Sequence, residues 1–414
     1  MIPAVRQAYN AAFTDARYAA FMRDLTKSMY WPVDFRVAES PLFLDEQATR
    51  ELVRAADDII AQLSTPAFRQ HAKTAIPQGL EVPKENPFPE FLCVDFALCR
   101  DDRPGGQASG KILPQLIELQ GFPTVACWQV LLTQAYRNHF TGLPADFTTY
   151  FGGLDEGGYL AALREAMLGG CLAENVVLLE IEPAKQKTAV DFACTHSYLG
   201  VRPMCVTKIV KRGRKLFYFS DGREVPIHRI FNRVIFDELL RKKPAMKFSF
   251  QDDLDVQWAG HPNWYFRISK HTLPFLKSPY VPECHFLSAF SGTVGAALRR
   301  DPLPLPTDLA NYVCKPLYSF AGLGVDIAPT KESIAAIPNP TEWLLQRKVA
   351  YAPIMETPDG PAKVEVRLIF AGNGSQMPTL VNNLARLTKG AMHGVDFNKG
   401  RTWVGASCAF HPAV

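Results

Sequence analysis

The chain has 414 residues, of which 47% are hydrophobic and 21% are charged, proportions that are ordinary for a globular protein. This length exceeds what a single hydrophobic core usually serves, so two or three subdomains are expected. The formal net charge is only +4, which gives no argument for a nucleic-acid partner in the absence of a clustered basic patch.

The cysteines and the N-terminal segment indicate the cellular compartment in which the protein is expected. The nine cysteines are scattered, without a CxxC pair, and several lie inside apolar runs, which predicts buried free thiols in a reducing compartment. The first residues lack the charged and apolar regions of a signal peptide, and no apolar stretch is long enough to span a bilayer. We therefore expect a cytoplasmic protein that has neither a nucleic acid nor a membrane as its partner.

The N-terminal part is predicted to be helical. Apolar residues recur at helix spacing within residues 1–75, with charged residues between them. Residues 76–91 carry four prolines, which remove backbone donors and restrict the preceding residues, so this stretch is expected to be an extended linker. We place the first boundary here, and residues 1–90 form a helical N-terminal region with its linker.

Two strands and a helix are expected next. Residues 91–99 and 113–120 are apolar runs with strand character, and the Asp-Asp-Arg-Pro-Gly-Gly segment that follows the first run is a strong turn signal. A helical stretch follows at about 125–140. These two runs are expected to be neighbouring strands.

Beyond residue 175 the pattern indicates a parallel sheet. The run 176–182 is typical of a buried strand, 187–200 is helix-like and ends at a glycine, and 202–210 is a second strand candidate. This spacing predicts a βαβ unit. Residues 215–231 then predict a hairpin that turns at Asp221-Gly222.

A second proline-rich connector, residues 301–309, precedes three strand-like segments separated by glycine-bearing loops. These segments are 312–316, 343–351 and 363–371. The expected class is α/β or α+β with mixed sheets. We divide the rest of the chain into a core at 91–300, with the βαβ substrate subdomain, and a closing segment at 301–414.

One loop has the features of a phosphate-binding segment. Lys315 ends an apolar strand, and the loop after it contains Gly322 and Gly324. Glycines let backbone N–H groups approach an anion closely, and a lysine adds a point charge beside phosphate oxygens. The lysine precedes the glycines, so this is not a Walker A loop. The alternative interpretation is a hairpin turn with a surface lysine.

Charged residues inside apolar strands are the second signal. Asp95 and Glu118 lie in such runs, where an unpaired charge is costly. Mg²⁺ takes oxygen ligands of this kind, and Gln120 shares a strand face with Glu118 at a spacing of two residues. The alternative is that these carboxylates are paired with arginines. Lys270 and Arg233 are candidates for holding a phosphate or a carboxylate, although each taken singly is also typical of a surface cation.

Taken together and in order, these segments resemble the glutathionylspermidine synthase-like branch of the ATP-grasp superfamily, over about residues 91–400. The resemblance implies an ATP-grasp-like fold in which Asp95, Glu118 and Gln120 hold magnesium. Gln120 stands where the family usually has asparagine, which lengthens this ligand by one methylene. The resemblance also implies that Lys315 and its loop to Gly324 lie over the phosphates, so that residues 301–414 supply the ATP-binding lid and the closing segment. It further implies that Lys270 contacts the nucleotide.

Further along the chain, the resemblance implies that Gln346 borders the adenine, with Lys348 beside it. Arg386 is its best phosphate candidate, and Arg233 is the candidate for holding the acceptor carboxylate. The implied activity is that of an ATP-dependent carboxylate–amine ligase, which uses ATP and Mg²⁺ and forms an amide through an acyl phosphate. The amine is expected to belong to an amino acid, a peptide or a polyamine.

Two other functions share the same predicted site. An ATP-grasp phosphotransferase would stop at phosphoryl transfer to a hydroxyl group, and product analysis separates it from a ligase. A non-catalytic nucleotide-binding protein of this fold would release no product, and the departure at Gln120 keeps that alternative open.

Overall fold

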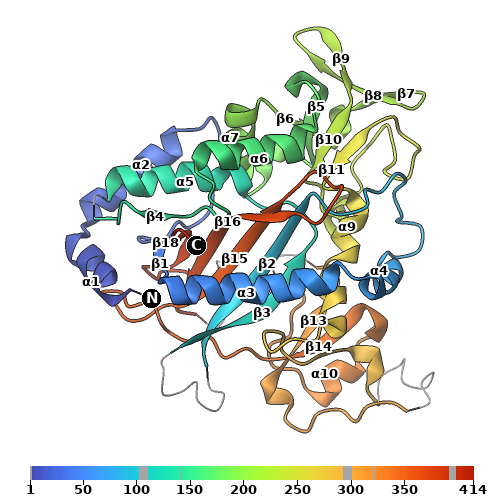
Figure 1. The fold of residues 1–414 in the computed structure, drawn as a ribbon. Coiled ribbons are helices and arrows are strands. Elements are labelled where there is room, and N and C mark those ends of the chain that lie inside the picture. The colour runs from blue at the N-terminus through green and yellow to red at the C-terminus, as the bar shows by residue number, and fades with distance from the viewer. Residues whose placement is uncertain (1, 102–110, 141, 292–300, 320–321, 391–397) are drawn as a thin grey trace.

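The computed structural model describes residues 2–101, 111–140, 142–291, 301–319, 322–390 and 398–414. Its centre is a five-stranded antiparallel sheet with strand order β17-β16-β15-β2-β3 (Figure 1). The strands span Gly405–Ser407 (β17), Thr379–Thr388 (β16), Lys363–Ala371 (β15), Phe91–Arg100 (β2) and Ile112–Gln120 (β3). The predicted pairing of β2 with β3 is confirmed. The predicted turn between them lies mostly outside the described residues.

Helices cover both faces of this sheet, which gives three layers. α3 (Glu46–Leu63) crosses one face, and α5 (Ala126–His139) and α6 (Glu156–Leu168) lie on the other (Figure 1). The apolar stripe of α3 predicted from helix spacing is buried against β2, β3 and β15. Its buried members include Leu52, Ala55, Ala56, Ile59 and Leu63. Because α5 is also confirmed where the sequence predicts it, the central layers follow directly from the hydrophobic pattern.

A second sheet is parallel and has the strand order β11-β10-β5-β6. It contains Gln257–Ala259 (β11), Arg229–Asn232 (β10), Val176–Glu180 (β5) and Arg202–Cys205 (β6). α7 (Ala189–Leu199) connects β5 to β6 and ends at Gly200, whose φ of 77° suits glycine. The predicted βαβ unit is therefore confirmed.

A three-stranded ribbon projects from this second sheet (Figure 1). It consists of Val210–Arg212 (β7), Lys215–Ser220 (β8) and Arg223–Ile227 (β9). The predicted hairpin turn is confirmed, because β8 and β9 pair up to Ser220 opposite Arg223, and the two turn residues, Asp221 and Gly222, have φ of 50° and 77°.

A third sheet lies beyond the β3 edge of the central sheet (Figure 1). It is antiparallel, with the order β12-β14-β13, and contains Cys284–Phe286 (β12), Trp343–Arg347 (β14) and Tyr312–Pro316 (β13). The strand predicted at 343–351 ends at Arg347, since its partner β13 begins there, with Tyr312 opposite Arg347. α10 (Lys331–Ala335) lies in the segment that joins β13 to β14.

The N-terminal region is largely helical, as predicted. It contains Pro3–Ala12 (α1), Asp15–Lys27 (α2), α3 and Pro66–Ala72 (α4), together with one short strand, Leu42–Phe43 (β1). β1 joins Ala409–Pro412 (β18) and Phe147–Thr148 (β4) in a small sheet. The described part of the chain also contains the α-helices Phe236–Lys242 (α8) and Pro262–Arg267 (α9). No helix in the described part of the chain is long and apolar enough to cross a membrane.

Candidate functional site

A band of charged side chains crosses one face of the central sheet. On β2, Asp95 lies opposite Glu118 of β3 and also opposite Arg367 of β15, while Glu365 of β15 lies opposite Arg386 of β16. Residues directly opposite one another share a sheet face, and so do residues two apart on a strand. These five residues, here called the charged band, therefore meet on one surface of four adjacent strands.

Asp95 is the centre of the band. Its side chain is only 1% exposed, and both of its oxygens accept from guanidinium groups. Arg367 approaches bidentately, with Nε and Nη2 each 2.6 Å from a carboxylate oxygen, and Arg386 Nη2 lies 2.5 Å away. Burial alone would raise the pKa of Asp95, but the two arginines outweigh it and lower that pKa below its usual value. Pairing with arginine is the alternative that the sequence left open for Asp95.

Arg386 is the partly exposed arginine of the charged band. It also donates to Glu365, whose second oxygen accepts from the Tyr351 hydroxyl at 3.0 Å. The Arg386 side chain remains 34% exposed, although its Nε is buried and has no hydrogen-bond partner among the described residues. The guanidinium is thus held by two carboxylates while part of the side chain reaches solvent.

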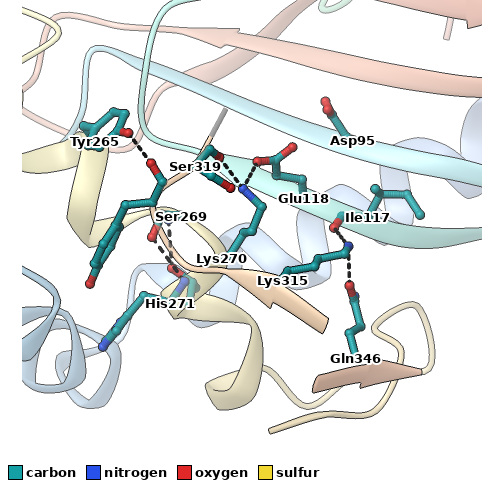
Figure 2. Close-up of polar contacts among 12 residues, drawn as sticks. Asp95, Ile117, Glu118, Tyr265, Ser269, Lys270, His271, Lys315, Ser319 and Gln346 are labelled. Carbon is teal, nitrogen blue, oxygen red and sulfur yellow. Dashed lines mark hydrogen bonds and ion pairs between the residues drawn. The ribbon is translucent and has the colours of Figure 1, made fainter. Parts of the chain in front are cut away.

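Glu118 continues the band toward the third sheet. Its Oε1 lies 2.8 Å from Nζ of Lys270, a residue at the start of the 3₁₀ helix η6 (Lys270–Phe275). The same ammonium donates to the carbonyl of Ser319 at 2.7 Å (Figure 2). Burial would raise the pKa of Glu118, but the charge of Lys270 lowers it overall. Glu118 is therefore a carboxylate that is ionised while largely buried.

Lys315 of β13 lies on the other side of Glu118 (Figure 2). Its Nζ donates to Oε1 of Gln346 at 2.6 Å and to the carbonyl of Ile117 at 3.4 Å. Both acceptors are neutral, and burial lowers the pKa of this lysine. Lys315 is thus a buried ammonium that shares the negative charge of Glu118 with Lys270.

A small pocket opens beside Glu118 and Lys270. It is lined by Glu118, Leu119, Gln120, Phe122, Tyr265, Ile268, Ser269, Lys270, Leu317, Tyr318 and Ser319. The segment that follows β13 forms one wall, and the hydroxyl of Tyr265 donates to the carbonyl of Tyr318 at 2.5 Å. Polar and aromatic groups therefore meet where the central and third sheets approach each other.

The glycine-bearing loop turns back on β13. Gly322 and Gly324 both have φ of 74°, a conformation that glycine adopts without strain, and Asp326 returns to pair with Cys314. The segment is therefore a turn, as in one of the two sequence interpretations, but Lys315 is buried and does not lie on the surface. Residues 320–321 of this loop lie outside the described residues.

Some predicted site residues lie elsewhere. Lys348 is exposed and donates to the carbonyl of Ala310, away from the charged band. Arg233 is buried at the end of β10 and donates to the carbonyls of Pro123 and Thr124. The hydroxyl of Thr124 in turn accepts from Arg367 at 3.0 Å, so the loop at residues 121–125 links Arg233 to the charged band.

The sequence analysis missed Arg367 and Glu365 as members of the site. The available signal was the Glu-Val-Arg spacing inside the apolar run of β15, which places two charges on one buried strand face. The partner strands of β15 are distant in sequence, so its position beside Asp95 was not readable from the spacing alone.

The carboxylates of the band do not form a closed metal cage. The described residues contain no group of three or more His, Cys, Asp or Glu side chains placed to hold a metal ion. Glu118 and Gln120 both line the small pocket and carry oxygen atoms of the kind that Mg²⁺ takes as ligands. Asp95 does not fit as a third ligand in this arrangement, because guanidinium groups contact both of its oxygens.

Comparison with known proteins bears on the fold of the chain. No protein-family model matches the sequence, and no curated protein matches it. Among solved structures, the chain is similar to a glutathione synthetase-like effector (GSS30) from Globodera pallida in its apo form. The TM-score is 0.55 at 10% sequence identity, and the match covers 100% of this chain and 99% of that chain. The protein is thus an α/β protein with several sheets that shares its overall fold with a glutathione synthetase-like protein.

Proposed function

We propose that this protein binds Mg-ATP between the central and third sheets and uses it to join a carboxylate to an amine. The observation that carries the proposal is the convergence of two buried lysines, Lys270 and Lys315, from separate elements beside Glu118. Burying an ammonium is costly, and buried charges of this kind cluster at functional sites. The neighbouring glycine-bearing turn and the glutathione synthetase-like fold support an ATP-grasp arrangement.

The charge balance favours a polyanion as the ligand. Four cationic side chains face three carboxylates: Lys270, Lys315, Arg367 and Arg386 against Glu118, Asp95 and Glu365. The surplus is positive, and it lies in a partly buried region where electrostatic interactions are stronger than in water. A nucleoside triphosphate supplies the negative charge and the oxygens that such donors bind.

Each residue then has a defined task. Lys270 and Lys315 would hold phosphate oxygens, and Gln346 would orient Lys315 and border the base. Glu118 and Gln120 would hold a magnesium ion, which supplies charge neutralisation at the phosphates when it is bound. Arg386, the exposed guanidinium of the charged band, would face the reacting phosphoryl group. Arg233 supports the loop at residues 121–125 through carbonyl contacts, which favours a positioning role for it.

The proposed reaction has two steps. An oxygen of the substrate carboxylate attacks the γ-phosphorus, the bond to the β–γ bridging oxygen breaks, and ADP leaves. The amine nitrogen of the second substrate then attacks the acyl carbon, inorganic phosphate leaves, and the nitrogen loses a proton. The protein contributes positioning, charge neutralisation and exclusion of water from the acyl phosphate. The substrates are small molecules, and the amine belongs to an amino acid, a peptide or a polyamine.

A second candidate is nucleotide binding without turnover. It is favoured by Asp95, whose two oxygens are taken by arginines, so that the metal site expected from the resemblance keeps only two of its three residues. Such a protein would bind Mg-ATP through the same lysines but would release no ADP.

The test is product analysis with mixtures of carboxylates and amines. The ligase proposal predicts ADP, phosphate and an amide in equal amounts, with formation that requires both substrates. Lys315→Met should abolish formation, whereas Lys348→Met, a control at an exposed lysine that follows the partner strand β14, should retain it. Nucleotide binding without ADP release under all mixtures would favour the second candidate, and a phosphorylated product would indicate a phosphotransferase.

A further inference from the structure

Both oxygens of the buried Asp95 carboxylate accept hydrogen bonds from guanidinium groups, which neutralise its charge. The Arg367 guanidinium spans both carboxylate oxygens at 2.6 Å, and Arg386 adds a third contact at 2.5 Å. Bidentate guanidinium–carboxylate pairs are among the strongest charge-assisted hydrogen bonds in proteins. A cation that entered here would have to displace positively charged guanidinium groups from a carboxylate that is only 1% exposed.

Neighbouring residues hold both arginines in place. The third nitrogen of Arg367 donates to the hydroxyl of Thr124 at 3.0 Å, and Arg386 also contacts Glu365, which accepts from Tyr351. The two arginines come from adjacent strands of the central sheet, so their backbone positions are fixed by its ladder. The arrangement is thus a preorganised pair of guanidiniums with Asp95 as its anchor.

We infer that Asp95 is an arginine-positioning residue and not a metal ligand, and that the Arg367–Arg386 pair takes the place of a second metal ion beside the terminal phosphate of a nucleoside triphosphate. This inference rests on the proposed function. Arg386 is the member that meets the ligand, since its side chain is 34% exposed while Arg367 is buried. A guanidinium can neutralise charge at a phosphoryl group as a metal ion does.

The chemistry of the band agrees with a single metal ion. Glu118 lies opposite Asp95 and faces Lys270 through one oxygen, and it is the one carboxylate of the band that has no arginine contact among the described residues. A magnesium ion that arrives with the nucleotide therefore meets Glu118 and Gln120 on one side, while the arginine pair occupies the position that a second ion would need.

The first experiment counts metal ions on the wild-type protein. Mn²⁺ is titrated as a probe for Mg²⁺ in the presence of an ATP analogue with a non-hydrolysable β–γ bond, and free Mn²⁺ is measured by electron paramagnetic resonance. We expect one Mn²⁺ per chain at saturation. Two ions per chain would overturn the inference.

Three carboxylate variants assign the ligand. Glu118→Gln should weaken Mn²⁺ binding to the nucleotide complex by about tenfold or more, the size of effect seen when a metal site is disturbed. Asp95→Asn disturbs the arginine pair but removes no metal ligand, so it should weaken Mn²⁺ binding clearly less than Glu118→Gln does. The matched control is Glu365→Gln, which removes the same charge from another arginine partner. A loss in Asp95→Asn that equals the loss in Glu118→Gln would overturn the inference.

A third measurement works on wild type even if Asp95→Asn fails to fold or no nucleotide binds. The Nε–H signal of Arg367 is followed by NMR while diamagnetic Mg²⁺ alone is added. It should keep its chemical shift, since the Arg367 guanidinium stays bound to Asp95, and loss of this hydrogen-bonded signal would show that the ion displaces the guanidinium from Asp95. Absence of nucleotide binding in wild type would refute the proposed function, and this signal would still decide the role of Asp95.

Discussion

The variant Lys315→Met should lose nucleotide binding without losing stability. Lys315 is buried, and its two acceptors are the neutral oxygens of Gln346 and Ile117. Methionine has a similar length and no charge, so the variant removes a desolvation penalty of several kcal/mol. Two losses of stability oppose this gain. The charged hydrogen bond of Lys315 is lost, at about 1.5–3 kcal/mol, and the amide oxygen of Gln346 is left without its donor, at about 1 kcal/mol. The balance predicts a variant as stable as wild type, or more stable by about 1 kcal/mol.

The assay is thermal unfolding with and without Mg-ATP. At a nucleotide concentration of about one hundred times its dissociation constant, wild type should gain roughly 2.7 kcal/mol. For a chain of this length that gain corresponds to a shift of a few degrees. Lys315→Met should show no such shift while its own midpoint is unchanged or slightly raised. Lys348→Met, which alters an exposed lysine, should keep both the midpoint and the shift.

The pH dependence of the free energy of unfolding tests whether the buried charge of Lys315 destabilises the folded protein. Burial lowers the pKa of Lys315 in the folded protein, so the folded state binds fewer protons than the unfolded state between that lowered pKa and the ordinary lysine value. The desolvation penalty of the Lys315 ammonium is fully present below the lowered pKa. It is relieved as the pH rises through that pKa. The stability advantage of Lys315→Met should therefore shrink toward alkaline pH. A variant that unfolds several degrees below wild type, or that keeps the Mg-ATP shift, would refute this reasoning.

Two further predictions concern buried carboxylates. Asp95→Asn leaves the buried Arg367 guanidinium without its counter-charge and takes from Arg386 one of its two carboxylate partners. It should lower the free energy of unfolding by about 3–5 kcal/mol in denaturant titrations, whereas Arg50→Gln, which breaks an exposed pair, should change it by less than about 0.5 kcal/mol. Because the pKa of Asp95 is lowered, its stabilisation should be lost only as the pH falls through that lowered value, and the loss should be missing in Asp95→Asn. Burial raises the pKa of Glu180 to about 8, so stability should fall as the pH rises from the ordinary glutamate value toward 8. Glu180→Gln keeps an acceptor for the Ile181 N–H and should remove that fall, with a gain of about 1–3 kcal/mol at neutral pH, measured by chemical unfolding across pH.

Much of the fold follows from local patterns in the sequence. The stripe of α3, the βαβ unit around α7 and the hairpin at Asp221-Gly222 are each encoded within about thirty residues, by hydrophobic period and turn chemistry. These patterns say which elements form, and the short βαβ connection also says how two strands pair.

The charged band could not be read in the same way. Asp95 meets Arg367 and Arg386 across 272 and 291 positions of sequence, and the register of β15 and β16 against β2 decides which charges touch. A shift of one residue would have turned these side chains to the opposite face. The sequence therefore allowed either a metal or an arginine partner for Asp95, and only the strand register distinguishes them.

For Lys348, local spacing in the sequence suggests a position that the structure does not give it. It lies two residues after Gln346, at the spacing that would place it on the same face of a continuing strand. Because β14 ends at Arg347, that alternation is no longer enforced, and the Lys348 side chain extends to the carbonyl of Ala310. Where a strand stops thus decides whether a nearby lysine contributes to the site.

The most direct test of the central claim is a calorimetric titration of wild type, Lys315→Met and Lys348→Met with Mg-ATP. The account predicts one nucleotide bound per chain for wild type and for Lys348→Met, and no measurable binding for Lys315→Met. Absence of binding in wild type, or equal binding in Lys315→Met, would contradict the nucleotide site and with it the proposed ligase.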